Sequence, residues 1–162
     1  MSSIGDAIQE KCLAFGDRVI RLNDYLLEQA ASQRPDVRGK KEEGRGRGQH
    51  ITSSTFRQTS RVPVHLKSVA NISNQLLRAG TSIGANNAEA TNAISKADFK
   101  SKSFIALKEA RESLYWIELL HRNNYLDDKQ YTSIHTDCEE LIKVLVHRCK
   151  KLNQEKDDNE KD

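Results

Sequence analysis

Acidic side chains and one histidine in the second half of this 162-residue chain have the residue types needed to hold a pair of metal ions. They are Glu109, Glu112, Glu118, His121, Glu139 and Glu140. A di-metal site in a helical bundle needs a Glu-x-x-His motif on each of two helices, because the ions take ligands from facing helices. Only Glu118 and His121 form such a motif, which leaves half of the site missing. The sequence therefore predicts no metal centre.

The sequence also lacks a paired-cysteine motif and the common catalytic motifs. The three cysteines, Cys12, Cys138 and Cys149, include no CxxC pair, and the first two fall in apolar helical patterns typical of buried free thiols. No phosphate loop, HExxH or GxSxG occurs. The Gly-Arg-Gly-Arg-Gly run at 44–48 follows no strand and opens no helix, so it is not a nucleotide loop. These observations predict a protein that is not an enzyme and needs no cofactor.

Positive charge is concentrated in residues 34–61, which carry eight Lys or Arg residues against three Asp or Glu residues. The resulting net charge of +5 exceeds the +3 of the whole chain. This composition, with four glycines, predicts a flexible, solvated loop whose cations can contact phosphates without reading sequence. The candidate nucleic-acid-binding residues are Arg38, Lys40, Lys41, Arg45 and Arg47, with Arg57 and Arg61 in support. The alternative is that the segment is only a linker.

Four amphipathic segments must position these residues. Apolar side chains recur at steps of three and four over residues 4–32, about 63–94, about 97–122 and about 127–152. In the third segment the stripe passes through Phe104, Leu107 and Leu114. Ser95 and Asp98 have the spacing of a capping box at its start. The last ten residues, 153–162, are acidic and apolar-free and predict a frayed tail.

This pattern predicts an all-α protein, an antiparallel up-down-up-down four-helix bundle with a long flexible loop between helices 1 and 2. Residues 1–162 form a single domain, with 34–61 as a basic insert and 153–162 as an acidic tail. The sequence lacks the run of about 20 apolar residues that spans a bilayer, and its N-terminus lacks a signal-peptide core. A cytoplasmic location is therefore expected.

Three residues interrupt the apolar pattern of the second segment. Gly80 and Gly84 lie four apart inside a helix, where each glycine costs about 1 kcal/mol relative to alanine. Either they let a neighbouring backbone approach, with Ala106 and Ala110 as close-packing residues opposite, or they let the helix bend. Asn87 stands where an apolar residue is expected. It is either part of an exposed helix end or a buried amide that fixes register.

Two stretches carry a family resemblance: QLLRAGTSIGANNAEA at 75–90 and SKADFKSKSFIALKEARESLYWIELL at 95–120. With residues 18–26, they closely resemble the bacterial four-helix-bundle family of proteins encoded in intervening sequences of 23S rRNA genes. Members of that family are similar to the accessory variability determinant protein of diversity-generating retroelements, a pentameric barrel that binds nucleic acid and reverse transcriptase. The resemblance implies a ring-forming, non-catalytic helical protein. Family members usually carry an aliphatic residue at the position of Asn87 and a short loop between helices 1 and 2, so this chain departs at both places.

Together these features suggest a non-enzymatic, oligomeric nucleic-acid-binding accessory protein that works beside a reverse transcriptase or another RNA-handling partner. RNA or DNA would be bound through phosphate contacts, and no membrane partner is expected. A homopentamer is expected by resemblance. Its candidate oligomer interface is Tyr115, Trp116 and Leu119, which widen the apolar face of the third helix. The alternative is a protein–protein scaffold ring that does not bind nucleic acid.

Overall fold

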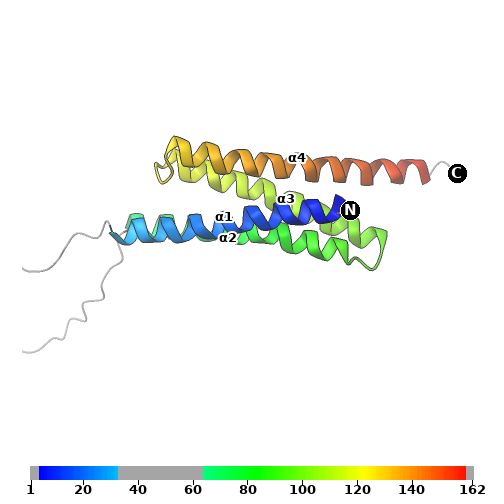
Figure 1. Cartoon of the computed structure of the whole chain (residues 1–162), viewed down its shortest axis with the longest axis horizontal. Helices are drawn as coiled ribbons and strands as arrows, with labels where there is room; N and C mark the ends of the chain where they lie inside the picture. Colours follow the sequence, from blue (N-terminus) through cyan, green and yellow to red (C-terminus); the bar gives the residue numbers. More distant parts are fainter. Residues whose placement is uncertain (1–3, 33–63, 160–162) are drawn as a thin grey trace, which may run out of the picture.

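Four long helices build the molecule (Figure 1): α1 (Ile4–Ser32), α2 (Val64–Thr91), α3 (Lys96–Arg122) and α4 (Asp128–Asn159). The computed structural model describes residues 4–32 and 64–159, and within these ranges all regular structure is helical. Consecutive helices run in opposite directions, so the α2–α3 turn lies at the same end of the bundle as the N-terminus of α1 and the C-terminus of α4. The predicted all-α four-helix bundle is confirmed. The basic segment between α1 and α2 lies outside the described residues.

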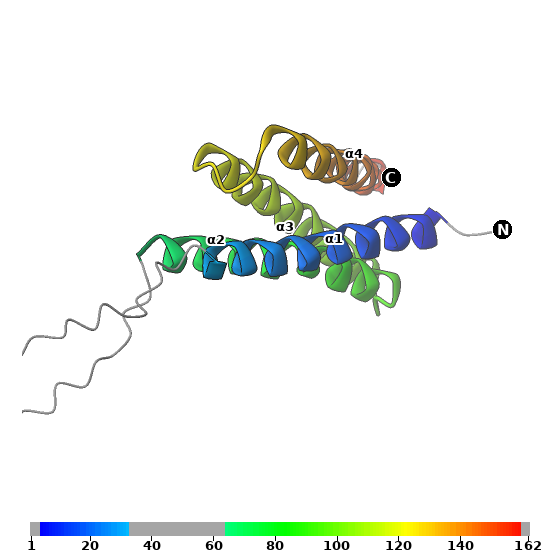
Figure 2. The same ribbon diagram turned by 60° about the vertical axis from the view of Figure 1, so that its left-hand side comes forward.

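The four helices pack unequally. α2 packs closely against both α1 and α3, α4 packs mainly against α3, and of the helix pairs in contact α1 and α4 pack least closely. Figure 2 shows α3 running obliquely from the α1–α2 pair to α4. Polar contacts bridge the open α1–α4 side: Arg18 pairs with Asp137 and donates from Nη2 to Ser133 Oγ at 2.9 Å. The Nζ atom of Lys11 lies 3.4 Å from Glu140 Oε2.

The buried faces of α1 and α4 follow the predicted apolar stripes. The buried side chains are Ile8, Cys12, Phe15, Val19 and Leu26 in α1, and Ile134, Cys138, Leu141, Leu145 and Cys149 in α4. Each large aliphatic side chain removed from water contributes about 1.5–3 kcal/mol, and neither helix could bury its stripe alone. These two seams therefore hold the bundle together across α2 and α3.

The core face of α3 differs from the predicted stripe. Its buried residues are small at first, Ser103, Ala106, Ala110 and Ser113, and are followed by Ile117 and Leu120. Phe104, predicted in the core, is 36% exposed, while Leu107 and Leu114 only flank the core cluster. The prediction for Phe104 was wrong because it followed side-chain bulk. Small side chains let α3 approach its neighbours closely, and the larger ones cover the edges of the contact.

Gly80 and Gly84 face α1. A Cβ atom at Gly80 would lie 3.0 Å from Val19 Cγ2, and one at Gly84 would lie 3.5 Å from Cys12 Cβ. The expectation that Ala106 and Ala110 of α3 lie opposite these glycines is therefore wrong. α1 and α2 approach so closely at Gly80 that a larger residue there would require the Val19 side chain to shift. Gly84 has room for a methyl group at ordinary contact distance.

Side chains cap both helices that follow the short turns. Ser95 Oγ accepts from the backbone N–H of Asp98 at 3.1 Å, and Asp98 Oδ2 accepts from the N–H of Ile94 at 3.2 Å. Asp127 and Gln130 exchange equivalent bonds of 2.7 and 3.0 Å at the start of α4. These bonds satisfy donors that a helix N-terminus leaves free. At its other end α4 continues to Asn159, through most of the tail that the sequence predicted to fray.

Candidate anion-binding site

A cavity of about 940 Å³ opens at the end of the bundle where the α2–α3 turn meets the last turns of α4. Four cationic side chains line it: Lys96 and Lys100 from α3, and Arg148 and Lys151 from α4. Apolar side chains, including Ala90, Phe99 and Leu152, form the rest of the wall. Among the described residues that line the cavity, none is acidic. The arrangement suits an anion that also presents an apolar surface.

Arg148 is held in place by contacts from two other helices. Its Nη1 donates to Asn87 Oδ1 of α2 at 2.6 Å, and its guanidinium carbon lies 5.7 Å from the centre of the Phe99 ring of α3. Asn87 is fully buried and donates from Nδ2 to Gln9 Oε1 of α1 at 2.5 Å. A hydrogen-bonded chain thus joins α1, α2 and α4, and α3 adds the ring of Phe99 beside it. Of the two alternatives for Asn87, the structure shows the buried amide.

The charge of Arg148 has no opposite charge beside it. Over residues 4–32 and 64–159, no carboxylate pairs with Arg148, and its hydrogen-bond acceptor is a neutral amide. Burial lowers the pKa of the guanidinium, which shows that its charge is partly removed from water. A partly buried charge without a counter-ion is unfavourable, so an anion arriving here gains more than it would at a solvated lysine. The fork of N–H groups also matches a phosphate or carboxylate geometrically.

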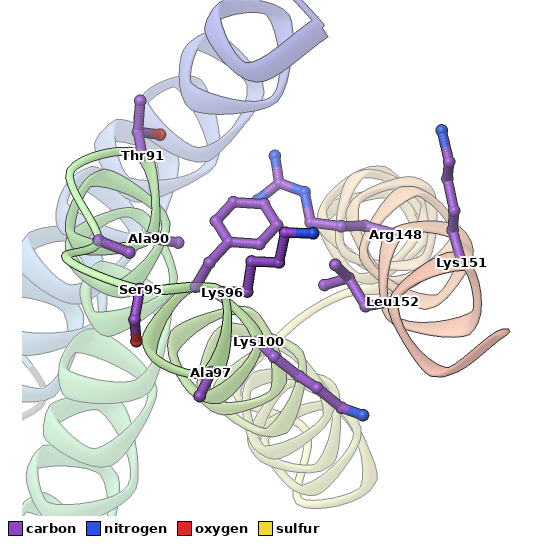
Figure 3. A pocket seen from close by; sticks show the side chains of 11 residues that line it. Ala90, Thr91, Ser95, Lys96, Ala97, Lys100, Arg148, Lys151 and Leu152 are labelled. Atoms are coloured by element: carbon purple, nitrogen blue, oxygen red, sulfur yellow. The ribbon is translucent and has the colours of Figure 1, made fainter. Parts of the chain in front are cut away.

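The three lysines line the same cavity as this guanidinium. In Figure 3, Lys96 reaches from α3 toward α4, Arg148 and Leu152 point back toward α3, and Lys100 and Lys151 extend to the two sides. In the described part of the chain none of the three lysines forms an ion pair, whereas nearby Lys102 pairs with Glu89. Repulsion among four like charges raises the free energy of the empty site. A polyanion would relieve this repulsion.

The candidate residues predicted from the sequence fall into three groups. The basic set Arg38, Lys40, Lys41, Arg45, Arg47, Arg57 and Arg61 lies outside the described residues. Tyr115 is 56% exposed, Leu119 is half-buried, and Trp116 packs against the core and donates to Glu112 Oε1 at 3.2 Å. Their role in assembly stays a prediction. Gly80, Gly84 and Asn87 all lie in the α1–α2 contact.

Sequence reasoning missed the four cations of the cavity. Lys96, Lys100, Arg148 and Lys151 are spread over two helices, and in one dimension they resemble ordinary solvated charges. The one signal that pointed to them was Asn87, a polar residue on an apolar seam. A buried amide requires a partner, and a search for that partner leads to Arg148.

Other chemistry finds little support in the described part of the chain. It contains no group of three His, Cys, Asp or Glu side chains arranged for a metal ion. Burial raises the pKa of Cys12 to about 11, with Arg148 offsetting a little of the rise, and raises that of Cys138 to about 12. Both thiols therefore stay protonated and poorly nucleophilic at neutral pH. None of the described helices combines the length and apolar character needed to cross a bilayer.

The fold and cavity define a four-helix-bundle protein with a cationic cavity at one end. Residues 46–147 match the family described as 23S rRNA-intervening sequence protein, and the chain belongs to this family. It is also similar to a solved structure from Bacteroides thetaiotaomicron, a protein of unknown function from the S23 ribosomal protein family. The two share 34% sequence identity and a TM-score of 0.63 over 90% of this chain and 97% of that one. No match is found among curated proteins.

Proposed function

We propose that this protein is a non-enzymatic accessory protein that binds nucleic acid through phosphate contacts. The observation that carries the proposal is the convergence of Lys96, Lys100, Arg148 and Lys151 on one cavity with no acidic lining. Phosphate groups are the repeating anions of nucleic acid, and their neutralisation by Lys and Arg releases bound counter-ions. The basic segment 34–61 would add sequence-independent contacts. The family's name, which refers to 23S rRNA, is consistent with an RNA ligand.

Salt dependence of binding tests this proposal. Fluorescence anisotropy with a labelled RNA of mixed sequence should show affinity falling steeply as salt rises. Replacing the four cavity cations by Gln should flatten the slope of log K against log salt by about 0.7–0.9 for each phosphate that the cavity neutralises. An unchanged slope and affinity would remove the cavity from nucleic-acid binding.

A matched control keeps the change in net charge the same. Lys11, Arg18, Arg21 and Lys143 already pair with carboxylates of the bundle, at Glu140, Asp137, Asp17 and Glu139. Their replacement by Gln removes the same number of cations but leaves the cavity intact. This variant should keep most of the slope. A separate replacement of Arg38, Lys40, Lys41, Arg45 and Arg47 by Ser measures the contribution of the basic segment.

Assembly into a ring is the second part of the proposal and rests on the family resemblance. A cyclic homo-oligomer, a pentamer by resemblance, would repeat the cationic cavity and raise avidity for a long polyanion. Tyr115, Trp116 and Leu119 are the proposed contacts. Light scattering at micromolar concentration should report a closed oligomer, and a monomer would contradict it.

A reverse transcriptase is proposed as the enzyme partner, again on the resemblance to the accessory variability determinant protein. Co-expression with a retroelement reverse transcriptase, followed by purification through a tag on either protein, tests this pairing. Co-purification that survives nuclease treatment would support direct contact. If the ring recruits the enzyme yet binds no nucleic acid, the protein is instead a protein–protein scaffold.

A further inference from the structure

The cavity at the α2–α3 turn combines two kinds of surface that a duplex could not use together. Cationic side chains line it, from Lys96, Lys100, Arg148 and Lys151, and apolar side chains of the same two helices lie between them, Phe99 on α3 and Leu152 on α4. A double helix offers phosphates outside but keeps its bases stacked inside. A single strand presents phosphates and unstacked bases side by side, and proteins hold it with cations and aromatic rings. The mixture of surfaces therefore favours a single strand.

Arg148 is the prearranged phosphate contact of this cavity. Asn87, which is fully buried, fixes the guanidinium from one side through the 2.6 Å bond to Nη1. The other N–H groups of the guanidinium donate to no acceptor among the described residues, so they are available to a ligand. A fork held in position loses little side-chain freedom when it binds a phosphate bidentately. Lys96, which points toward it, supplies a second cation (Figure 3).

The apolar wall lies directly beside this contact. Phe99 lines the cavity with its ring centre 5.7 Å from the Arg148 guanidinium carbon, while Leu152 projects from the facing helix. The volume of about 940 Å³ falls within the range of about 300–1,000 Å³ typical of small-molecule sites. A nucleobase next to a bound phosphate would therefore find an apolar surface within the same cavity.

We infer that this cavity binds one nucleotide of a single strand, with its phosphate on Arg148 and Lys96 and its base against Phe99 and Leu152. The inference rests on the proposed nucleic-acid binding and specifies the form of its ligand. It makes the protein selective for single-stranded over double-stranded RNA or DNA, with little preference among bases.

The test compares one labelled single strand of about ten nucleotides, a usual length for such sites, with the same strand annealed to its complement. The variants are Phe99→Leu, which removes the ring, and Leu152→Gln, which makes the partly exposed wall polar. Phe99→Leu should weaken single-strand binding about five- to 150-fold, because one stacked base is lost. Leu152→Gln should act in the same direction and answers the question if Phe99→Leu fails to fold. Phe104→Leu, an aromatic change on α3 outside the cavity, is the matched control and should leave both affinities unchanged.

The outcomes separate this inference from the proposed function. If both wall variants bind the single strand as tightly as the parent, no base occupies the cavity, and phosphate binding by the four cations still stands. If the parent binds neither form, the proposed function itself fails. If the four-cation variant binds both forms as well as the parent, the cavity takes no part in binding and this inference fails. Equal affinity of the parent for single strand and duplex would also overturn the inference.

Small ligands give an independent measurement on the same protein. Uridine monophosphate should displace the single strand at a lower concentration than inorganic phosphate at equal ionic strength, because it adds the base. Uridine, which lacks the phosphate, should compete poorly. Equal competition by uridine monophosphate and inorganic phosphate would show that the apolar wall does not contribute.

Discussion

The two ends of the bundle handle charge in opposite ways. At the α3–α4 turn, His121 Nε2 lies 2.9 Å from Asp128 Oδ1, and Asp127 and Gln130 cap each other. Further along α4, Arg18 of α1 pairs with Asp137. At the α2–α3 turn, four cations surround a cavity and none of them has a carboxylate partner among the described residues.

This contrast distinguishes charged residues that stabilise the fold from charged residues that are available to a ligand. Both ends join antiparallel helices through short capped turns, but among the described residues the four cations that line one cavity lie at the α2–α3 end. Charges without counter-ions lower stability, and proteins keep such unfavourable features mainly where a ligand uses them. The α3–α4 end, where His121 lies beside Asp128, is therefore a structural reference for the cavity end, and equivalent substitutions at the two ends should behave differently.

The largest difference is expected for the buried polar contacts between α1 and α2. Asn87→Leu should lower the free energy of unfolding by about 2–3 kcal/mol, because Arg148 and Gln9 lose their partner in a partly buried place. At the other end, Ser73 is 1% exposed and donates to Asn23 Oδ1 at 2.7 Å. Ser73→Ala removes one neutral bond and should cost only about 1 kcal/mol. Urea unfolding of each variant measures both.

A double substitution sharpens this comparison. Replacing both polar partners, as in Asn87→Leu with Arg148→Met, should recover most of the lost stability, since neither group is then left buried without a partner. The recovered stability should come with loss of anion binding. If Asn87→Leu alone is as stable as the parent, the guanidinium reaches solvent freely and the cavity is not strained by its charge.

Inorganic phosphate should stabilise the cavity end selectively. At about ten times its dissociation constant, a ligand of the folded state adds about 1.4 kcal/mol to the free energy of unfolding. Thermal melts in phosphate, against chloride at matched ionic strength, should show this rise for the parent and for Arg18→Gln. The rise should be absent in Arg148→Gln. Equal shifts in all three proteins would indicate a general salt effect.

Two buried serines on the α3 seam give a smaller contrast. Ser103, near the cavity end, has a buried hydroxyl without a hydrogen-bond partner among the described residues. Ser113, toward the other end, donates to the carbonyl oxygen of Glu109 at 2.9 Å. Ser103→Ala should therefore raise the free energy of unfolding by about 1 kcal/mol, whereas Ser113→Ala should change it by less. Urea unfolding measures both variants. If the two substitutions change the free energy of unfolding equally, the Ser103 hydroxyl has a hydrogen-bond partner after all.

The smallest effect is expected from the paired arginine itself. The side chains of Arg18 and Asp137 are 37% and 39% exposed, so solvent screens much of their attraction. Arg18→Gln should lower the free energy of unfolding by no more than about 1 kcal/mol. High salt should reduce the difference further. A loss that persists at high salt would show that the contacts with Ser133 matter more than the charge.

The helices were predictable because their apolar periodicity is long and regular. The stripe of α1 and its bounds at 4–32 agree with the structure, and so does the cap at Ser95. The face of α3 was not predictable in the same way. Side-chain bulk favours Phe104 as a core residue, but the core selects Ser103 and Ala106, because the closeness of two helices depends on tertiary packing.

The candidate site was much less accessible from the sequence. Lys96 and Arg148 are distant in the chain and meet only because α3 and α4 run antiparallel. Local charge density is visible in the sequence, and it marks residues 34–61. A cluster that the fold assembles from single cations on two helices cannot be recognised in this way. Asn87 was noticed because it breaks a pattern, yet its partners Gln9 and Arg148 required the fold.

The close approach of α1 and α2 at Gly80 bears on how this lineage can vary. Val19 against Gly80 and Cys12 against Gly84 set the register of the two helices through their own surfaces. The entropy of closing a connection grows only with the logarithm of its length, by about 0.6 kcal/mol for each doubling. A segment that joins helices held in this way can be lengthened or rewritten with little effect on the core. The junction after α1 is therefore a natural splice point, where a stretch such as 34–61 can be acquired without redesign of the bundle.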